Sequence, residues 1–293
     1  MSSHDPSTPS QPFRHPHHSR RMRVFISIDM EGISGIVARE QVTPGERDYQ
    51  IGRELMTLEA NAAVEGALAA GAKEIVVRDA HAYKSNLLPE LLHEAADFVS
   101  GTPTPLSMVE GLEAGADALV LVGYHAREGT IGGVLDHTMS SRSVAAIIVN
   151  GREFGETALS AMVAGDLGIP TVFLSGDRAA CGQARELIPG ISTVAVKEGL
   201  GRHAARCLNP KRARPLVREG VKKALRSSKA KPFVVRPPVG VVVEFKDSAK
   251  ADVAARLPEA KRVAGHSVAF TAGSAIEAYR VATAMLTMAQ AAL

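Results

Sequence analysis

The sequence predicts an α/β fold in which a mostly parallel sheet is flanked by helices and followed by a smaller α+β C-terminal subdomain. Between residues 22 and 205, short apolar segments alternate with longer segments of helical periodicity, which is typical of parallel strands joined by helices. At about residue 206 the residue pattern changes, and a stretch rich in Lys and Arg with helical spacing begins. Residues 1–21 are rich in Ser, Pro and His. We therefore expect a disordered N-terminal extension (1–21), an α/β domain (22–205) and an α+β C-terminal subdomain (206–293).

The first half of the α/β domain contains three expected strands and one long helix. The apolar segments 24–29, 74–81 and 116–126 have the length and β-branched composition of buried strands. Residues 48–70 carry apolar side chains at helical spacing, and Gly71 follows them. Glycine is the usual residue just beyond a helix because it adopts the left-handed conformation without strain. This order of elements predicts a largely parallel sheet.

The second half of the domain begins with a predicted hairpin. The dipeptide Asn150-Gly151 interrupts the apolar segment 146–154, and this dipeptide favours the type I′ turn that joins two antiparallel strands. The alternation then resumes with an expected helix, strand and helix at residues 156–166, 171–177 and from Asp177 onward. Residues 22–205 therefore predict an open sheet with helices on both faces.

The C-terminal segment has a different pattern. Residues 210–231 are basic and helical in spacing, and the apolar segments 238–245 and 267–273 are each followed by a helical pattern. A charge run of this kind is typical of a solvated helix face. We therefore expect α+β structure here without a polyanion-binding surface.

Composition and charge exclude several classes of partner. The formal net charge is +3, and residues 1–21 contribute three arginines against one aspartate, so residues 22–293 carry only +1. Because the net charge of this part of the chain is so close to zero, we expect no nucleic-acid partner. No apolar run approaches the roughly 20 residues that span a bilayer, so no membrane partner is expected. The two cysteines and the lack of a signal-peptide pattern favour the cytoplasm.

Potential metal ligands follow three of the predicted strands. Asp29 and Glu31 come at the end of the first, His81 at the end of the second and His125 at the end of the third, while Glu156 begins the helix after the hairpin. The carboxyl ends of parallel strands meet at one edge of a sheet, where ligands gather. Extended residues two apart point to the same side, about 6.6 Å apart. Asp29 and Glu31 can therefore serve one site.

This set of side chains predicts zinc chemistry. Carboxylates and neutral imidazoles are the ligands expected of hydrolytic zinc, and three acids with two histidines suit two ions better than one. Each residue taken singly also has a structural explanation, such as Glu156 stabilising a helix N-terminus. Their recurrence at successive strand ends favours the metal interpretation. Asp79, two residues before His81, would either orient that imidazole or lie exposed.

Ten short segments, distributed from about residue 23 to the C-terminus, carry a recognisable pattern. They are SIDMEGISG (27–35), GRELMTLEAN (52–61), RDAH (78–81), SMVEGL (107–112), GYHA (123–126), GVLDHTM (133–139), VNGREFGE (149–156), SGD (175–177), LIP (187–189) and CLNP (207–210). In these segments, and in their order along the chain, the sequence resembles the zinc-dependent D-aminopeptidase family of dinuclear metallopeptidases.

The resemblance implies roles for individual residues. It implies two Zn²⁺ ions per chain, with Asp29 bridging them and His137 as the catalytic histidine; a loop histidine positioned by packing is the structural alternative for His137. It also implies short peptide substrates and a large homo-oligomer, a ring assembly such as a decamer with enclosed active sites. The implied metal ligands are Asp29, Glu31, His81, His125 and Glu156.

We therefore expect a dinuclear zinc aminopeptidase that hydrolyses the N-terminal residue of short peptides, including peptides that contain D-amino acids. Two alternatives remain open. A dinuclear-metal amidase or another hydrolase acting on a non-peptide substrate would use the same ligands, and substrate profiling would separate it from a peptidase. A non-catalytic, ring-forming peptide-binding protein would hold one structural metal in a closed four-ligand site, which metal stoichiometry would reveal.

Overall fold

The computed structural model describes residues 21–292, so the predicted N-terminal extension lies outside the described residues except for Arg21. The helices in the described part of the chain are α1 (Arg39–Val42), α2 (Tyr49–Ala70), α3 (Glu156–Asp166), α4 (Arg178–Leu187), α5 (Pro210–Ser227), α6 (Ser248–Ala254) and α7 (Ala275–Ala289), with 3-10 turns η1 (Pro89–Leu91), η2 (Ser107–Val109) and η3 (Leu112–Ala114). None of these helices has the length and apolar character needed to cross a bilayer.

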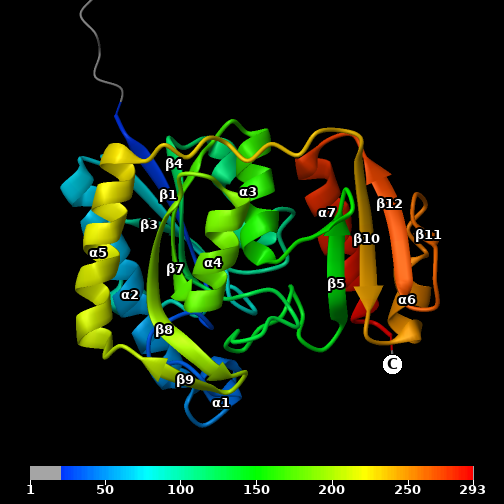
Figure 1. Ribbon diagram of the computed structural model, residues 1–293, viewed down its shortest axis with the longest axis horizontal. Coiled ribbons are helices and arrows are strands. Elements are labelled where there is room, and N and C mark those ends of the chain that lie inside the picture. The colour runs from blue at the N-terminus through cyan, green and yellow to red at the C-terminus, as the bar shows by residue number, and fades with distance from the viewer. Residues whose placement is uncertain (1–20, 293) are drawn as a thin grey trace, which may run out of the picture.

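Sheet A has seven strands and lies in the left half of the molecule in Figure 1. In spatial order they are β3 (Asp97–Val99), β2 (Glu74–Asp79), β1 (Arg23–Ile28), β4 (Ala118–Tyr124), β7 (Thr171–Asp177), β8 (Ser192–Gly201) and β9 (Ala204–Cys207). All neighbours are parallel except β8 and β9. The expected α/β fold with a mostly parallel sheet is confirmed.

The register of the three central strands places their carboxyl ends side by side. Ile28, the last residue of β1, lies opposite Asp79 of β2 on one side and Val122 of β4 on the other. These strands form because both of their faces are buried, so apolar residues can follow one another without polar alternation. The residues after β1, β2 and β4 consequently emerge at one edge of sheet A.

The two faces of sheet A pack against different layers. In β1, Val24 and Ile26 belong to a core cluster that contains residues of α2 and α5, whereas Phe25 belongs to the cluster that contains residues of α3 and α4. This alternation follows from the period of two in a strand. Figure 1 shows α2 and α5 on the left of the sheet, with α3 and α4 between sheet A and sheet B.

Sheet B is a second, antiparallel sheet. In spatial order it contains β11 (Lys261–Arg262), β12 (Ser267–Ala272), β10 (Val239–Phe245), β5 (Val144–Val149) and β6 (Arg152–Glu153). The predicted hairpin turn is confirmed, because Asn150 and Gly151 both have positive φ, 47° and 82°. Helices α6 and α7 pack against β10 of this sheet.

The C-terminal segment is organised differently from the sequence expectation in one respect. Strand β5 pairs with β10, so sheet B takes strands from both sides of residue 206. Helix α5 packs against α2, with Ala213, Val217 and Val221 buried, so it covers sheet A rather than sheet B. The division of the chain into two units at residue 206 stays a prediction.

Candidate metal centre

Three of the predicted ligands meet at the carboxyl edge of sheet A. Asp29 directly follows β1, His81 follows β2 after one residue, and His125 directly follows β4. The backbone ladder continues past the strands, since Asp29 donates its N–H to the Val122 carbonyl at 2.9 Å and Ala80 donates to Ile28 at 2.8 Å. These three side chains are buried together because their strands are neighbours in the sheet.

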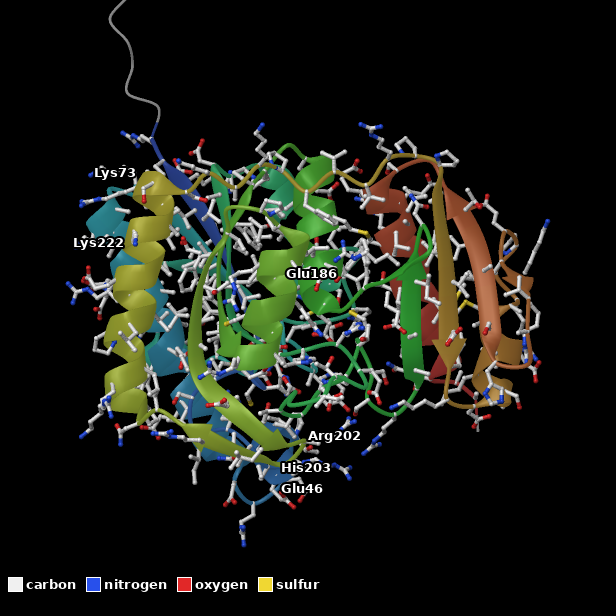
Figure 2. All side chains as sticks on the ribbon, viewed as in Figure 1. Glu46, Lys73, Glu186, Arg202, His203 and Lys222 are labelled. Carbon is white, nitrogen blue, oxygen red and sulfur yellow. The ribbon has the colours of Figure 1, made fainter. Side chains whose placement is uncertain are left out.

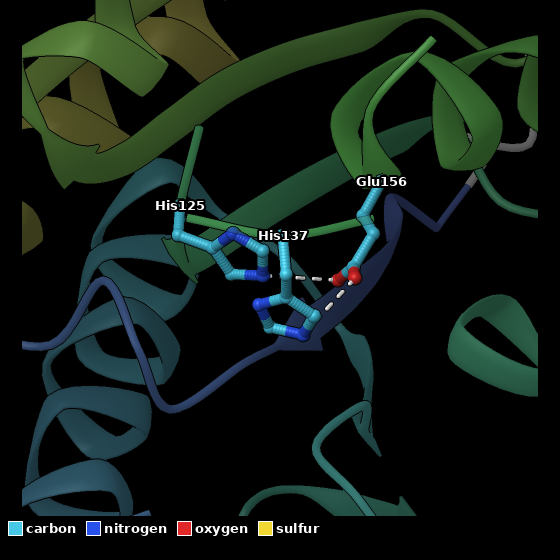
Figure 3. Close-up of side chains that lie close together, drawn as sticks. All are labelled: His125, His137 and Glu156. Carbon is cyan, nitrogen blue, oxygen red and sulfur yellow. Dashed lines mark ion pairs between the residues drawn. The ribbon is translucent and has the colours of Figure 1, made fainter. Parts of the chain in front are cut away.

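Glu156 reaches the same place from the other direction. It is the first residue of α3, which follows the sheet B hairpin, and its side chain points toward His125 and His137 (Figure 3). Its Oε1 accepts the Met139 N–H at 2.6 Å. Glu156 is only 4% exposed, so a carboxylate is held away from water at the start of a helix, where the helix dipole favours negative charge.

The carboxylate of Asp29 lies between two imidazoles. Its Oδ1 is 3.3 Å from His81 Nδ1, and its Oδ2 is 3.4 Å from His125 Nε2. Each imidazole also faces a second carboxylate: Glu31 Oε2 is 2.9 Å from His81 Nδ1, and Glu156 Oε2 is 3.3 Å from His125 Nε2. The site is therefore two carboxylate–imidazole clusters that share Asp29.

The other nitrogen of each imidazole contacts a backbone carbonyl. His81 Nε2 lies 2.7 Å from the Val42 carbonyl oxygen, and His125 Nδ1 lies 2.8 Å from that of Ala126. A carbonyl only accepts, so each ring must carry a hydrogen there, and in a neutral ring the nitrogen facing the carboxylates then carries a lone pair. Such orientation by a carbonyl is characteristic of metal-binding histidines. The lone pairs face carboxylate oxygens, an arrangement that requires a cation or a proton between them.

Buried atoms without partners fit a metal. Within residues 21–292, Asp29 Oδ2, Glu31 Oε2 and His125 Nε2 are buried and receive no hydrogen bond. Unpartnered buried polar atoms are rare in folded proteins. Ligand atoms of Asp29, Glu31 and His125 lie within 4.8 Å of one another, and so do those of His125, His137 and Glu156. The carboxylate and imidazole donors present therefore fit zinc.

The electrostatics of the site also favour positive charge. Burial alone would raise the pKa of the Asp29, Glu31 and Glu156 carboxyls, but the nearby imidazoles outweigh it and lower all three, that of Glu156 to about 2. Burial alone would lower the pKa of the two histidines, but the carboxylates outweigh it, raising that of His81 well above its usual value and that of His125 to about 10. Without a metal, protons bound to the imidazoles neutralise the carboxylates.

The structure brings His137 next to the five proposed ligands. Its ring stacks on that of His125, with centroids 4.1 Å apart and planes at 10° (Figure 3). His137 Nδ1 lies 2.9 Å from the Leu135 carbonyl oxygen, and Nε2 is 3.5 Å from Glu156 Oε1. This nitrogen is close enough to act on a bound substrate or to join the metal ligands. Its role as the catalytic histidine stays a prediction.

Asp79 has a different role from either expectation. It is fully buried, and it accepts hydrogen bonds from the backbone N–H groups of Asn86 and Leu87 and from the Asn86 side chain. Its contact with His81 is to the backbone N–H at 3.3 Å, not to the ring. Asp79 therefore fixes the loop after β2, while the Val42 carbonyl orients the His81 imidazole.

A cleft of about 560 Å³ opens over this site. Its lining includes Asp29, Glu31, His81, His137 and Glu156. Exposed arginines, among them Arg39, Arg142 and Arg202, also line it. Figure 2 shows Arg202 and His203 at the turn between β8 and β9, where they project from the hairpin.

The loops that line the cleft contain unusual backbone conformations. Ala82, Lys84, Leu135 and Met139 all line the cleft and have positive φ values of 42°, 60°, 53° and 62°. Non-glycine residues rarely adopt this conformation, and it concentrates at functional sites. Lys84 received no role in the sequence analysis; its position three residues after His81 was the one signal that could have marked it.

Comparisons with known proteins agree with the geometry. The model of peptidase family M55, described as D-aminopeptidase, matches residues 22–284. A D-aminopeptidase of Bacillus subtilis (strain 168) is 38% identical over 274 residues, which cover 93% of this chain and 98% of that protein. The solved structure of the Zn-dependent D-aminopeptidase DppA from Bacillus subtilis, a self-compartmentalizing protease, matches with a TM-score of 0.88 and 36% identity, covering 92% of this chain and 98% of that one.

The resemblance drawn from the sequence motifs is thus confirmed along nearly the whole described chain. The family model spans residues 22–284, which include the strands, the loops and the helix that bring the acids and histidines together, and the relative that is 38% identical covers 93% of the chain, so the chain belongs to the M55 family of D-aminopeptidases.

Proposed function

We propose that this protein is a dinuclear zinc aminopeptidase that removes the N-terminal residue from short peptides, including peptides with a D-amino acid at that position. The observation that carries the proposal is the Asp29 carboxylate, which presents one oxygen to His81 and the other to His125. A carboxylate placed in this way can hold two ions. Glu31 would complete the position beside His81, and Glu156 the position beside His125.

Two zinc ions bound here would lower the pKa of a water molecule towards roughly 7 and polarise the scissile carbonyl. The protein's own residues would do the rest. The Val42 and Ala126 carbonyls orient the His81 and His125 rings, so that the other nitrogen of each ring faces the site. His137 Nε2 faces the site and can donate a hydrogen bond to the developing oxyanion or a proton to the leaving amine.

The chain also supports two proposals about its setting. We propose a large homo-oligomer with enclosed active sites, supported by the self-compartmentalizing relative and to be checked by the mass in solution. We further propose a cytoplasmic location. Both cysteines are free, Cys181 buried and Cys207 half-buried, as expected in a reducing compartment.

The decisive experiment is turnover of a panel of matched dipeptides by the zinc-loaded enzyme. The panel would contain L-Ala-L-Ala, D-Ala-D-Ala and D-Ala-Gly, with p-nitrophenyl phosphate and N-acetyl-alanine amide as non-peptide comparators. We expect release of the N-terminal amino acid from the D-dipeptides to exceed hydrolysis of both comparators. Faster hydrolysis of a comparator would replace the peptidase by the amidase or phosphatase alternative. Metal-loaded protein that hydrolyses nothing in the panel and holds one ion would favour the peptide-binding alternative.

A further inference from the structure

Lys84 places a buried ammonium group in the cleft that contains the candidate metal ligands. The residue is 8% exposed and lines the cleft with Asp29, His81 and Glu156. Its Nζ donates to the Ala80 carbonyl, the one hydrogen bond that the described residues provide for it. An ammonium has three N–H donors, so two remain for another acceptor. A lysine is rarely buried unless its charge has a partner.

The charges around Lys84 come from the metal site. Burial lowers the pKa of Lys84, and the carboxylates that oppose this effect include Asp29 and Glu156. Asp29 is the carboxylate that the two clusters share, and Glu156 belongs to the cluster that contains His125. The ammonium therefore lies within electrostatic reach of both clusters. The Arg78 guanidinium adds a smaller repulsion, and Asp79 a smaller attraction.

The backbone of Lys84 is fixed in a costly conformation. Its φ is +60°, a left-handed conformation that is strained for a residue other than glycine. Its N–H donates to the His81 carbonyl at 2.7 Å, and its own carbonyl accepts the Gly101 N–H at 2.6 Å and the Ser100 hydroxyl at 2.8 Å. A glycine would satisfy the same turn without strain. The turn alone therefore does not explain why a lysine, and not a glycine, stands at this position.

Charge balance indicates what the ammonium can do. Three carboxylates, those of Asp29, Glu31 and Glu156, line the cleft. Two divalent ions and one hydroxide would balance their three negative charges. When the hydroxide oxygen bonds to the carbonyl carbon, the π electron pair moves to the carbonyl oxygen, which becomes an oxyanion. Collapse of the oxyanion would restore the C=O double bond and break the C–N bond, whose electron pair leaves with the nitrogen. His137 Nε2 would supply the proton that this nitrogen takes up. A fixed donor beside the oxyanion lowers the barrier, because it is oriented before the charge develops.

We propose that the Lys84 ammonium is a catalytic residue that hydrogen-bonds to the scissile carbonyl oxygen as that oxygen becomes negative. The inference rests on the proposed peptide hydrolysis and adds a residue to it. The alternative is structural: Lys84 would only hold the Ala80 carbonyl and the loop after β2. A second alternative is that Lys84 binds the C-terminal carboxylate of the peptide.

The test uses the zinc-loaded full chain with Lys84→Met and Lys84→Gln, and with Lys84→Ala for rescue by added ethylamine. Glutamine can still donate to the Ala80 carbonyl but has no charge, so it separates the structural explanation from the catalytic one. Lys73→Met is the matched control, because Lys73 is an exposed lysine far from the cleft (Figure 2). For each protein, kcat, KM and zinc content are measured with D-Ala-D-Ala and with D-alanine amide, which lacks a carboxylate. The inhibition constants of a phosphinic dipeptide analogue and of the product D-alanine are measured as well.

We expect both Lys84 variants to keep the wild-type zinc content and to lose about 10²–10³-fold in kcat on both substrates, the usual effect of removing one oxyanion donor. The inhibition constant of the tetrahedral phosphinic analogue should rise by a similar factor, while that of D-alanine changes less than about threefold. In Lys84→Ala, added ethylamine should restore part of kcat in proportion to its concentration. The Lys73→Met control should match wild type.

Other results would overturn the inference. A loss in Lys84→Met that Lys84→Gln restores would assign Lys84 to the Ala80 carbonyl, and so would a loss that follows zinc content or melting temperature without amine rescue. A rise in KM confined to D-Ala-D-Ala would assign it to the carboxylate. If the wild-type protein hydrolyses the peptides and both variants keep its kcat, the inference about Lys84 is wrong, while the proposed function stands. Wild-type protein that hydrolyses no peptide would remove the proposed function and the inference with it.

Discussion

The imidazole of His137 stacks on that of His125, with ring centroids 4.1 Å apart and planes at 10°. The Leu135 carbonyl fixes the other side of the His137 ring, so Nε2 can face only Glu156 and the cleft. The stack places a candidate ligand and a candidate proton donor in contact. Their roles can be separated only by variants that report metal content and turnover independently.

Replacing His137 by Ala should lower turnover by about two to four orders of magnitude, the scale of a lost general acid or base, while zinc content stays at the wild-type level. His81→Ala and His125→Ala should lose zinc and turnover together, because each removes a ligand. Elemental analysis alongside peptide hydrolysis distinguishes the three. If His137→Ala loses an ion, His137 is a ligand together with His125 and Glu156, whose ligand atoms lie within 4.8 Å of its own.

The shared position of Asp29 predicts an asymmetry among the acids. The wild-type protein should bind about two zinc ions per chain. Asp29→Ala should lose both, since its two oxygens face His81 and His125, whereas Glu156→Ala should retain one ion beside His81. Zinc content after dialysis against buffered metal gives the answer. A wild-type stoichiometry near one, or one ion retained by Asp29→Ala, would contradict the bridging role.

In the metal-free protein, the His125–Glu156 pair should contribute a pH-dependent stability. The pKa of His125 rises from 6.5 to about 10, so its contribution is complete below 6.5 and is lost as pH rises toward 10. The pKa of Glu156 falls from 4.5 to about 2, so its contribution is complete above 4.5 and is lost as pH falls toward 2. The pair should therefore stabilise the fold most between pH 4.5 and 6.5.

The difference in melting temperature between metal-free wild type and metal-free His125→Gln isolates this effect from other titrating groups. We expect the difference to be largest near pH 5.5 and to shrink by about pH 9, since the imidazolium is present in the folded state but not in the unfolded state across that range. A difference that grows with pH would show that His125 is neutral in the metal-free protein.

Two glycines offer a matched test of the backbone beneath the ligands. A Cβ added at Gly32 would lie 2.1 Å from the Tyr124 carbonyl oxygen, whereas one added at Gly182 in α4 meets nothing within 4 Å. Gly32→Ala should lower the free energy of unfolding by about 1–3 kcal/mol or more and weaken zinc binding. Gly182→Ala should raise it by roughly 0.5–1 kcal/mol, the usual gain from removing a helix glycine. Urea unfolding of the zinc-loaded proteins measures both.

The sequence predicted where the candidate ligands lie because these residues follow local patterns. A strand such as β1 is visible as an apolar run, and Asp29 follows it directly, so chain position alone places the residue at the strand end. Helix α3 begins at Glu156, as its sequence pattern predicted. The rule for strand–helix–strand units predicted a largely parallel sheet. The order β2, β1, β4 depends on which strands pair, and no local pattern in the sequence specified it.

Long-range pairing accounts for what the sequence did not predict. Strand β5 joins β10, and nothing within either segment specifies a partner about ninety residues away. Strand β8 was missed because its residues are largely half-buried or exposed and it includes Lys197, which is 3% exposed and donates to the backbone carbonyls of the 31–36 loop. The residue type alone does not show whether a lysine is buried or exposed to solvent, and only the fold distinguishes the two.

The candidate ligands follow strands of sheet A and the hairpin of sheet B, and this arrangement has a mechanical consequence. Asp29 and His81 follow strands of sheet A, whereas Glu156 follows the last residues of the sheet B hairpin. An ion bound to both groups would be a non-covalent cross-link between the sheets, to be broken before they separate. Metal loading should therefore slow global unfolding and protect the α3 region from protease digestion, since the binding free energy adds to the barrier. Catalytic competence and survival during heating would then depend on the same ions.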